Sequence, residues 1–191
     1  MANNPSAEKQ SASKELVFPV VVLVVICLVC SAILAVLNNI TAPIIEANTR
    51  AETLAAYVSV LPQGTTTDEL TEVENLTTAN VSGAVKTAAG DVAVKAAATG
   101  YSGKDVTVYV AFDADGAISG ISIDASTQTT GIGSKVAEDS YEESYVGIEG
   151  SEGSGAVDVD AIAGATYSSN AAETAIKNAV DYIDQLLEGV A

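Results

Sequence analysis

The chain has 191 residues, a length that suits one domain of ordinary size and an accessory segment. It carries 25 acidic residues against 8 basic ones, so it lacks the clustered Lys and Arg that binding to nucleic acid requires. It contains no histidine, which excludes histidine-based acid–base chemistry and most zinc sites. Any chemistry must therefore come from a cofactor, from carboxylates or from hydroxyl groups.

An apolar segment near the N-terminus predicts a membrane anchor. Residues 1–15 are polar, and we expect them to form a disordered tail. The run from Leu16 to Leu37 has no charge and, at about 1.5 Å per residue, is long enough to cross a hydrocarbon core of roughly 30 Å. A cleaved signal peptide is the alternative, but the run is long and its end, Ala35-Val36-Leu37, lacks a small-x-small cleavage site. We therefore expect residues 16–38 to be an uncleaved transmembrane helix in contact with lipid.

The charges beside this span indicate its orientation. Lys9 and Lys14 precede the span, whereas Arg50 is the basic residue close after it. The positive-inside rule then predicts a single-pass membrane protein with a cytoplasmic N-terminus and an extracytoplasmic C-terminal domain. Cys27 and Cys30 lie within the span, where we interpret them as packing residues; a role as metal ligands with a partner subunit is the alternative.

The pattern beyond the span predicts an α+β domain. Residues 39–62 are expected to form a connecting helix, and Gln63 to Thr87 an irregular surface segment. Three antiparallel strands follow, the last two joined by the turn residues Asp113 to Gly116: Val92–Thr99, Val106–Phe112 and Ile118–Ile123. The expected fold class is α+β, with one N-terminal transmembrane helix followed by an antiparallel sheet and flanking helices in residues 63–191.

The C-terminal third alternates helix and loop signals. A helix is expected from Lys135 to Tyr145, and a flexible acidic loop from Gly147 to Gly155. The final helix carries an apolar stripe, and Asn170 with Glu173 matches a capping box that would begin it.

A threonine just before this helix is the candidate site of chemistry. Thr166 follows Gly164 and Ala165, two small residues that leave its hydroxyl open to approach, and a helix N-terminus stabilises a phosphate. Asp160 lies upstream, where it could position a metal-bound phosphate. The residues alone permit a phosphate ester on Thr166 but do not require one, because a Gly-Ala-Thr turn before a helix is ordinarily only a turn and cap.

Resemblance to a known family favours the phosphate ester. The stretch from Asp160, D-A-I-A-G-A-T-Y-S-S, resembles the flavinylation motif of FMN-binding domains, Asp-x-x-Ser/Thr-Gly-Ala-Thr, although Ala163 stands where Ser or Thr is usual. These domains occur in the G subunit of the Rnf complex and in the C subunit of the sodium-pumping NADH:quinone reductase. The resemblance implies that a flavin transferase moves FMN from FAD onto Thr166, with Asp160 serving that transfer.

Two further stretches resemble the same family. Gln128 to Gly133, Q-T-T-G-I-G, is similar to the loop Glu-Thr-Pro-Gly-Leu-Gly that cradles the isoalloxazine ring, and Gly100 to Gly103 is similar to a Gly-Tyr-x-Gly motif. The residues that would then contact the flavin ring are Thr129, Thr130, Gly131, Ile132 and Gly133. Because the domain is acidic, we also expect Ser168, Ser169 and nearby backbone amides to face the phosphate as donors.

The resemblance implies a function for the chain. We expect an electron-transfer subunit of an Rnf-type ferredoxin:NAD oxidoreductase. Its covalent FMN would relay electrons among the other membrane and iron–sulfur subunits, and the whole complex would couple this transfer to movement of Na⁺ or H⁺. Alone the chain would complete no reaction, and we assign it no catalytic residue and no metal ligand. The alternatives are a covalent-FMN subunit of a quinone reductase or of an extracellular electron-transfer chain, and a membrane-anchored acidic binding module without cofactor.

Overall fold

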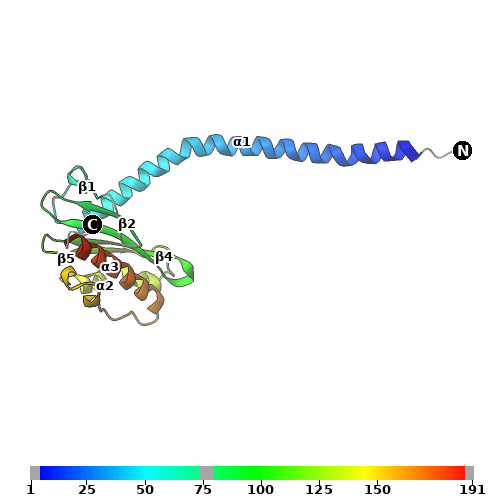
Figure 1. Cartoon of the computed structure of the whole chain (residues 1–191). Helices are drawn as coiled ribbons and strands as arrows, with labels where there is room; N and C mark the ends of the chain where they lie inside the picture. Colours follow the sequence, from blue (N-terminus) through cyan, green and yellow to red (C-terminus); the bar gives the residue numbers. More distant parts are fainter. Residues whose placement is uncertain (1–4, 74–79, 188–191) are drawn as a thin grey trace. The chain divides into compact units, whose positions relative to one another are not determined.

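The computed structural model describes residues 5–73 and 80–187, and the side chains of residues 5–16 and of Ser151 are left out. The chain divides into two compact units, Met1–Ala51 and Glu52–Ala191, which are described separately. Figure 1 gives the order of the elements along the chain.

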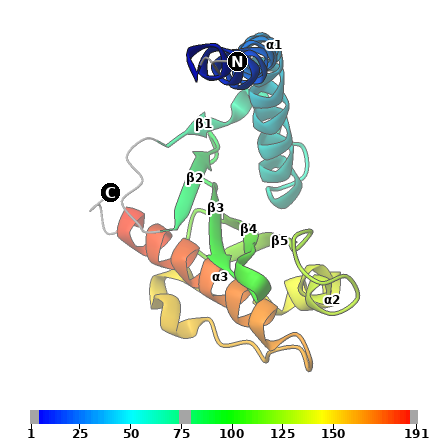
Figure 2. The same ribbon diagram turned by 90° about the vertical axis from the view of Figure 1, so that its right-hand side faces the viewer.

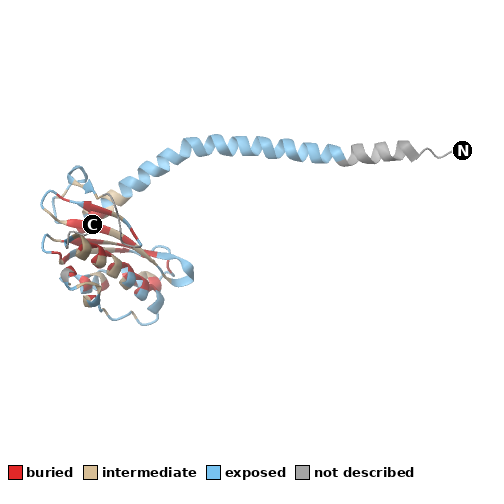
Figure 3. Ribbon diagram, in the orientation of Figure 1, coloured by how far each residue is buried: buried red, intermediate tan, exposed pale blue. Residues whose placement is uncertain are grey.

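The first unit consists of one helix, α1 (Pro5–Val60), which continues into the second unit (Figure 1). Its described part within residues 17–51 is exposed, as Figure 3 shows. Val17–Val60 is the one described helical segment that is long and apolar enough to cross a membrane. This finding fits a single-pass membrane protein.

The helix differs from the sequence prediction at its N-terminal end. Residues 5–15 are helical where we expect a disordered tail, because Ala, Glu, Lys and Gln are strong helix formers; residues 1–4 lie outside the described part. No break separates the span from the connecting helix, although Pro43 lies inside α1. The Thr41 hydroxyl donates to the Leu37 carbonyl oxygen at 2.9 Å, a bond that uses a helix carbonyl within this stretch.

The second unit is built on a five-stranded antiparallel sheet in the order β1-β2-β3-β4-β5, a simple meander. Its strands are β1 (Thr71–Glu72), β2 (Val81–Lys86), β3 (Val92–Thr99), β4 (Asp105–Phe112) and β5 (Ile118–Asp124). The three predicted strands are confirmed within one residue. The turn is confirmed too, since the Asp113 carboxylate accepts from the N–H groups of Asp115 and Ala117.

The segment Gln63–Thr87 is not irregular throughout, because β1 and β2 lie in it. Strand β2 buries Val81, Ala84 and Val85, but its short run also holds Ser82 and Gly83, so the sequence pattern is weak. Residues 74–79 lie outside the described part.

Two apolar layers cover the two faces of the sheet. Helix α3 (Thr166–Leu187) packs on β3 and β4, as Figure 2 shows, and buries the main core there. The inward residues on β4 are Val106, Val108, Val110 and Phe112, and those on α3 include Ala172, Ala175, Ile176 and Ala179. On the opposite face, the last turns of α1 and the residue after it pack against the sheet: Leu54, Tyr57, Val60 and Leu61 against Val85, Ala93 and Ala111. The alternation of β2, β3 and β4 therefore serves both faces.

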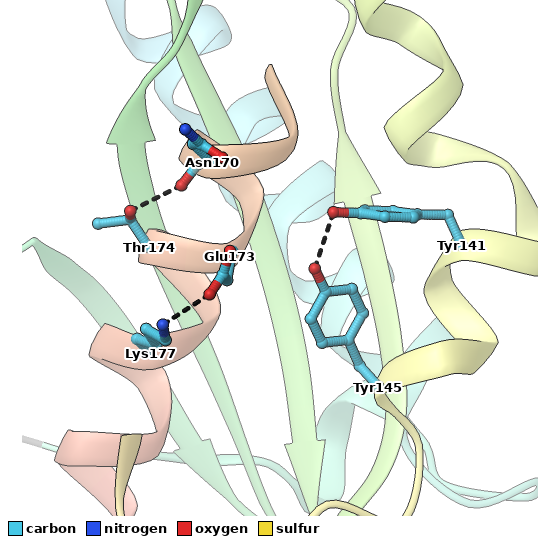
Figure 4. Close-up of polar contacts among 6 residues, drawn as sticks. All are labelled: Tyr141, Tyr145, Asn170, Glu173, Thr174 and Lys177. Carbon is cyan, nitrogen blue, oxygen red and sulfur yellow. Dashed lines mark hydrogen bonds and ion pairs between the residues drawn. The ribbon is translucent and has the colours of Figure 1, made fainter. Parts of the chain in front are cut away.

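The predicted helix Lys135–Tyr145 is instead a series of short turns: η3 (Gly133–Ala137), α2 (Asp139–Glu142) and η4 (Glu143–Tyr145). Tyr141 and Tyr145 are both buried, and the Tyr145 hydroxyl donates to that of Tyr141 at 2.9 Å (Figure 4). The two residues are four apart, so both rings lie on one side of this helical segment and reach the core together.

The predicted loop Gly147–Gly155 is regular in part. It contains two 3-10 turns, η5 (Gly150–Glu152) and η6 (Ser154–Ala156), and the N–H of Gly150 donates to the Gly116 carbonyl at 2.9 Å. The glycines that suggested flexibility therefore allow close packing at Gly150, which is buried.

Helix α3 begins at Thr166, so the capping box predicted at Asn170 is wrong. Glu173 lies inside the helix and accepts instead from the Lys177 ammonium at 2.6 Å (Figure 4). The Asn170 carbonyl accepts from the Thr174 hydroxyl at 2.6 Å. Ser168 and Ser169 are weak helix formers by themselves, but both are buried and have hydrogen-bond partners outside the helix, which favours the extra turn.

Candidate functional site

The two motifs that resemble the FMN-binding family meet at an open cavity of about 300 Å³ beside the start of α3. Its lining combines three stretches of the chain: Tyr101; Thr129, Ile132 and Gly133; and Gly164, Ala165, Tyr167 and Ser168. The structure thus brings together residues that are far apart in sequence. The other predicted site residues are not among the lining residues: Thr130, Gly131, Asp160, Thr166 and Ser169.

Thr166 is the first residue of α3, and it is exposed. The turn before it is closed by a hydrogen bond from the Ala165 N–H to the Ile162 carbonyl at 2.9 Å, with Gly164 at a φ of 84°. Helical bonding starts when the Ser169 N–H donates to the Ala165 carbonyl at 2.9 Å. The first N–H groups of a helix have no acceptor within it, so they can stabilise an anion close to Thr166.

Ser168 and Ser169 are buried, and both hydroxyl groups make hydrogen bonds inside the protein. The Ser168 hydroxyl donates to the Gln128 side-chain oxygen at 2.9 Å. Ser169 Oγ accepts from the Ile162 N–H at 3.0 Å, which fixes the turn before Thr166. Both serines therefore hold the surroundings of Thr166 in place, and that their side chains face a phosphate stays a prediction.

Gln128 joins the three stretches that line the cavity, and it is only 6% exposed. Its amide nitrogen donates to the Lys104 carbonyl at 3.0 Å and to the Thr127 hydroxyl at 3.1 Å. Its amide oxygen accepts from the Tyr101 N–H at 3.1 Å and from Ser168. The amide group thus uses both its donor and its acceptor sides, which a carboxylate in the same place would not do.

Two glycines make room for this amide. A Cβ atom at Gly100 would lie 2.8 Å from Gln128 Oε1, and one at Gly133 would lie 2.5 Å from Ser168 Oγ. Both distances are below van der Waals contact, so a side chain at either position would displace the Gln128 or Ser168 side chain. Gly100 and Gly133, the glycines of the two family motifs, therefore leave the space that the Gln128 and Ser168 side chains occupy.

Sequence reasoning missed the role of Gln128. Its partners Lys104 and Ser168 lie 24 and 40 residues away, so no local pattern reports them. The sequence offers one signal, namely Gly100 and Gly133 in the two stretches that resemble family motifs. A glycine at such a position indicates that another part of the protein packs closely against the backbone.

Acidic side chains do not build a metal centre at this site. Asp160 is exposed and does not line the cavity. Within residues 5–73 and 80–187, no group of three or more His, Cys, Asp or Glu side chains is placed to hold a metal ion.

The residues of the cavity fit a flavin mononucleotide. Three apolar or aromatic side chains at the cavity are exposed, namely Tyr101, Ile132 and Tyr167, and a flat ring system would cover them. The start of α3 offers N–H groups for a phosphate. Gly133 contributes only backbone atoms to the lining of the cavity.

Comparison with protein families agrees with this geometry. A family model described as the FMN-binding domain matches residues 100–181, a range that includes the cavity residues, β5 and most of α3. A second model, described as the RnfG N-terminal region, matches residues 20–60, most of the apolar helix. No curated protein matches the chain. Together the two matches make the chain similar to the RnfG subunit and support an FMN-binding electron-transfer subunit.

Proposed function

We propose that the chain carries FMN as a phosphoester on Thr166 and relays electrons within an Rnf-type membrane complex. The observation that carries the proposal is the position of Thr166. This residue is exposed at the first position of α3, next to a cavity that both family motifs line. A phosphate on its hydroxyl would lie at a helix N-terminus, while the ring of the same cofactor would have an apolar cavity beside it.

The attachment is a group transfer from FAD. The Thr166 oxygen forms a bond to the phosphorus of the FMN half, the pyrophosphate bond of FAD breaks, AMP leaves, and the threonine proton passes to a base of the flavin transferase. Asp160 is exposed six positions upstream, where a transferase can reach it, and we assign it to holding the metal ion of that reaction.

The chain's own residues bind and orient the cofactor. Thr129, Thr130, Gly131, Ile132 and Gly133 contact the ring, Gly164 and Ala165 shape the turn, and Ser168 and Ser169 keep the start of α3 in register. When bound, the flavin supplies one- and two-electron transfer, which the side chains themselves cannot. A covalent tether suits a relay, because the cofactor stays at a fixed distance from its donor and its acceptor.

The membrane setting follows from α1. We infer that residues 16–38 cross the bacterial cell membrane once, that residues 39–62 connect the span to the flavin domain, and that residues 63–191 lie on the extracytoplasmic side. The match to the RnfG N-terminal region implies membership of a multisubunit Rnf complex. The proposed partners are its other membrane and iron–sulfur subunits, and the complex as a whole moves Na⁺ or H⁺.

Intact mass of the purified full-length chain tests the attachment. Expressed with a flavin transferase, the chain should gain the mass of FMN less one water, and Thr166→Val should gain nothing. Thr130→Val is the matched control, because it removes a hydroxyl from the other motif and should still be modified. An unmodified wild-type chain, in a host where a known acceptor becomes flavinylated, would contradict the proposal and favour the acidic binding module.

Co-purification tests the complex. An affinity tag on this chain should bring down several membrane and iron–sulfur subunits from its native membrane. Recovery of a quinone reductase or of an extracellular electron-transfer chain would instead support the other covalent-FMN assignment. The RnfG match favours the Rnf complex.

A further inference from the structure

Two exposed tyrosines flank the cavity that the proposed function uses. Tyr101 and Tyr167 both line it, and their side chains are 54% and 73% exposed. Their ring centroids lie 6.2 Å apart at an interplanar angle of 56°. The rings are therefore close neighbours without stacking on each other, and aromatic surface of both stays open to a third ring.

One buried side-chain oxygen holds both the loop of Tyr101 and the residue that follows Tyr167. Gln128 Oε1 accepts from the Tyr101 N–H and also from the hydroxyl of Ser168, which follows Tyr167 in the chain. The loop of Tyr101 is closed further, because the Gly100 N–H donates to the Lys104 carbonyl at 2.8 Å.

The loop also contains an unusual backbone conformation. Ser102 has a φ of 59°, in the left-handed region that residues other than glycine rarely adopt. Such conformations persist where the surrounding structure enforces them, and they are common at binding sites. Tyr101 thus stands on a shaped, fixed loop, which lowers the entropy lost when a ligand binds.

We propose that Tyr101 and Tyr167 form an aromatic clamp that holds the isoalloxazine ring of the flavin. The proposal rests on the flavin attachment at Thr166 and extends the ring contacts beyond the loop Thr129–Gly133. Tyr167 directly follows the attachment residue, and Tyr101 is its neighbour in space. The exposed side chain of Ile132 lines the same cavity, so the ring meets apolar surface from both motifs.

The test compares flavinylated full-length variants in detergent. Tyr101→Leu, Tyr167→Leu and the double variant remove the rings, while Tyr101→Phe and Tyr167→Phe keep them. Intact mass is measured first, so that failure of attachment is separated from failure of the clamp. In variants that carry the flavin, loss of the rings should raise flavin emission and lower its fluorescence anisotropy, most in the double variant, whereas the Phe variants should stay near wild type.

Tyr109→Leu is the matched control. Tyr109 packs edge-on against Tyr57 at 5.6 Å and does not line the cavity, so its loss should leave flavin emission and anisotropy unchanged. A double Leu variant with full flavin mass and wild-type emission and anisotropy would overturn the clamp.

A second measurement covers the case in which no variant gains flavin mass. Free FMN is then titrated into the full-length Thr166→Val chain, with and without the tyrosine changes. The clamp predicts that each Leu change weakens Kd by about threefold to tenfold, as expected for loss of one aromatic contact. Equal Kd values, or no binding of FMN by any variant, would overturn the clamp by this route.

Discussion

The Ser168 hydroxyl donates a hydrogen bond to Gln128 Oε1 at 2.9 Å, although 40 residues separate the two in sequence. This bond joins the start of α3 to the loop Gln128–Gly133. Gln128 also binds the loop of Tyr101 through the Tyr101 N–H and the Lys104 carbonyl. The shape of the cavity therefore depends on one buried amide group.

Replacing this amide by a carboxylate should destabilise the domain. Gln128→Glu removes the donor to the Lys104 carbonyl and to Thr127, and it places a negative charge against a carbonyl oxygen in a buried position. We expect unfolding to become easier by about 1–3 kcal/mol at pH 7, measured by urea denaturation.

The pH dependence of this variant distinguishes charge from packing. Burial should raise the pKa of the introduced carboxyl above its value in the unfolded chain. The loss of unfolding free energy should therefore shrink as the pH falls towards 4, because the protonated carboxyl can again donate a hydrogen bond. Thr130→Glu is the control, because it adds the same charge at an exposed position and should change stability little. A loss in Gln128→Glu that is equal at pH 7 and pH 5 would contradict the role of the donor.

Gly133→Ala should disturb the cavity through overpacking. The new Cβ would lie 2.5 Å from Ser168 Oγ and 2.9 Å from Gln128 Cβ, so at least one of these side chains must move. A cost of about 1–3 kcal/mol in unfolding free energy is expected. Gly155→Ala, where the added Cβ has no neighbour within 4 Å, should cost clearly less. Equal effects of the two changes would show that the contact at Gly133 is unimportant.

The position of Asn170 inside α3 can be tested by a single substitution. If Asn170 capped the helix, its change to Ala would cost about 1 kcal/mol, as is typical for a lost N-cap. Because α3 begins at Thr166, we expect Asn170→Ala to change the unfolding free energy by less than about 0.5 kcal/mol. Ser169→Ala is the contrast: it removes the acceptor for the Ile162 N–H and should be clearly destabilising.

These cases show what the sequence can and cannot predict. Strands β3 to β5 follow from alternating apolar residues and a strong turn, both local signals, and they are confirmed. Strand β2 was missed because Ser82 and Gly83 interrupt a short pattern, although it pairs with β3 along most of its length. This segment forms a strand because it pairs with β3, and hydrophobic periodicity does not predict that pairing.

The site shows the same division. The two motifs were recognisable by resemblance, and the cavity brings their residues together. The start of α3 and the role of Gln128 were not predictable, because both depend on hydrogen bonds between distant residues. In the sequence, Ser168 and Ser169 suggest a cap or a turn. They are compatible with a helix because their side chains have hydrogen-bond partners outside it.

Alkaline pH should destabilise the domain through Tyr145. Burial, followed by the hydrogen bond to Tyr141, raises the pKa of the Tyr145 hydroxyl well above its ordinary value (Figure 4). The unfolded chain then loses the proton first, near pH 10, so stability is complete below that value and falls as the pH rises beyond it. Tyr145→Phe should reduce the slope of unfolding free energy against pH above 10, while costing about 1 kcal/mol at pH 7. An unchanged slope in this variant would exclude Tyr145 as the titrating group.

The role proposed for Asp160 separates transfer of the flavin from its binding. Asp160 is exposed and does not line the cavity, so Asp160→Asn should leave the folded domain unchanged. If its carboxylate holds a metal ion during transfer, the initial rate of flavinylation should fall by about tenfold or more, followed by intact mass over time. Asp158→Asn is the control, because it removes an equally exposed carboxylate from the same stretch and should be modified at the wild-type rate. A normal rate in Asp160→Asn would remove Asp160 from the transfer reaction while leaving Thr166 as the acceptor.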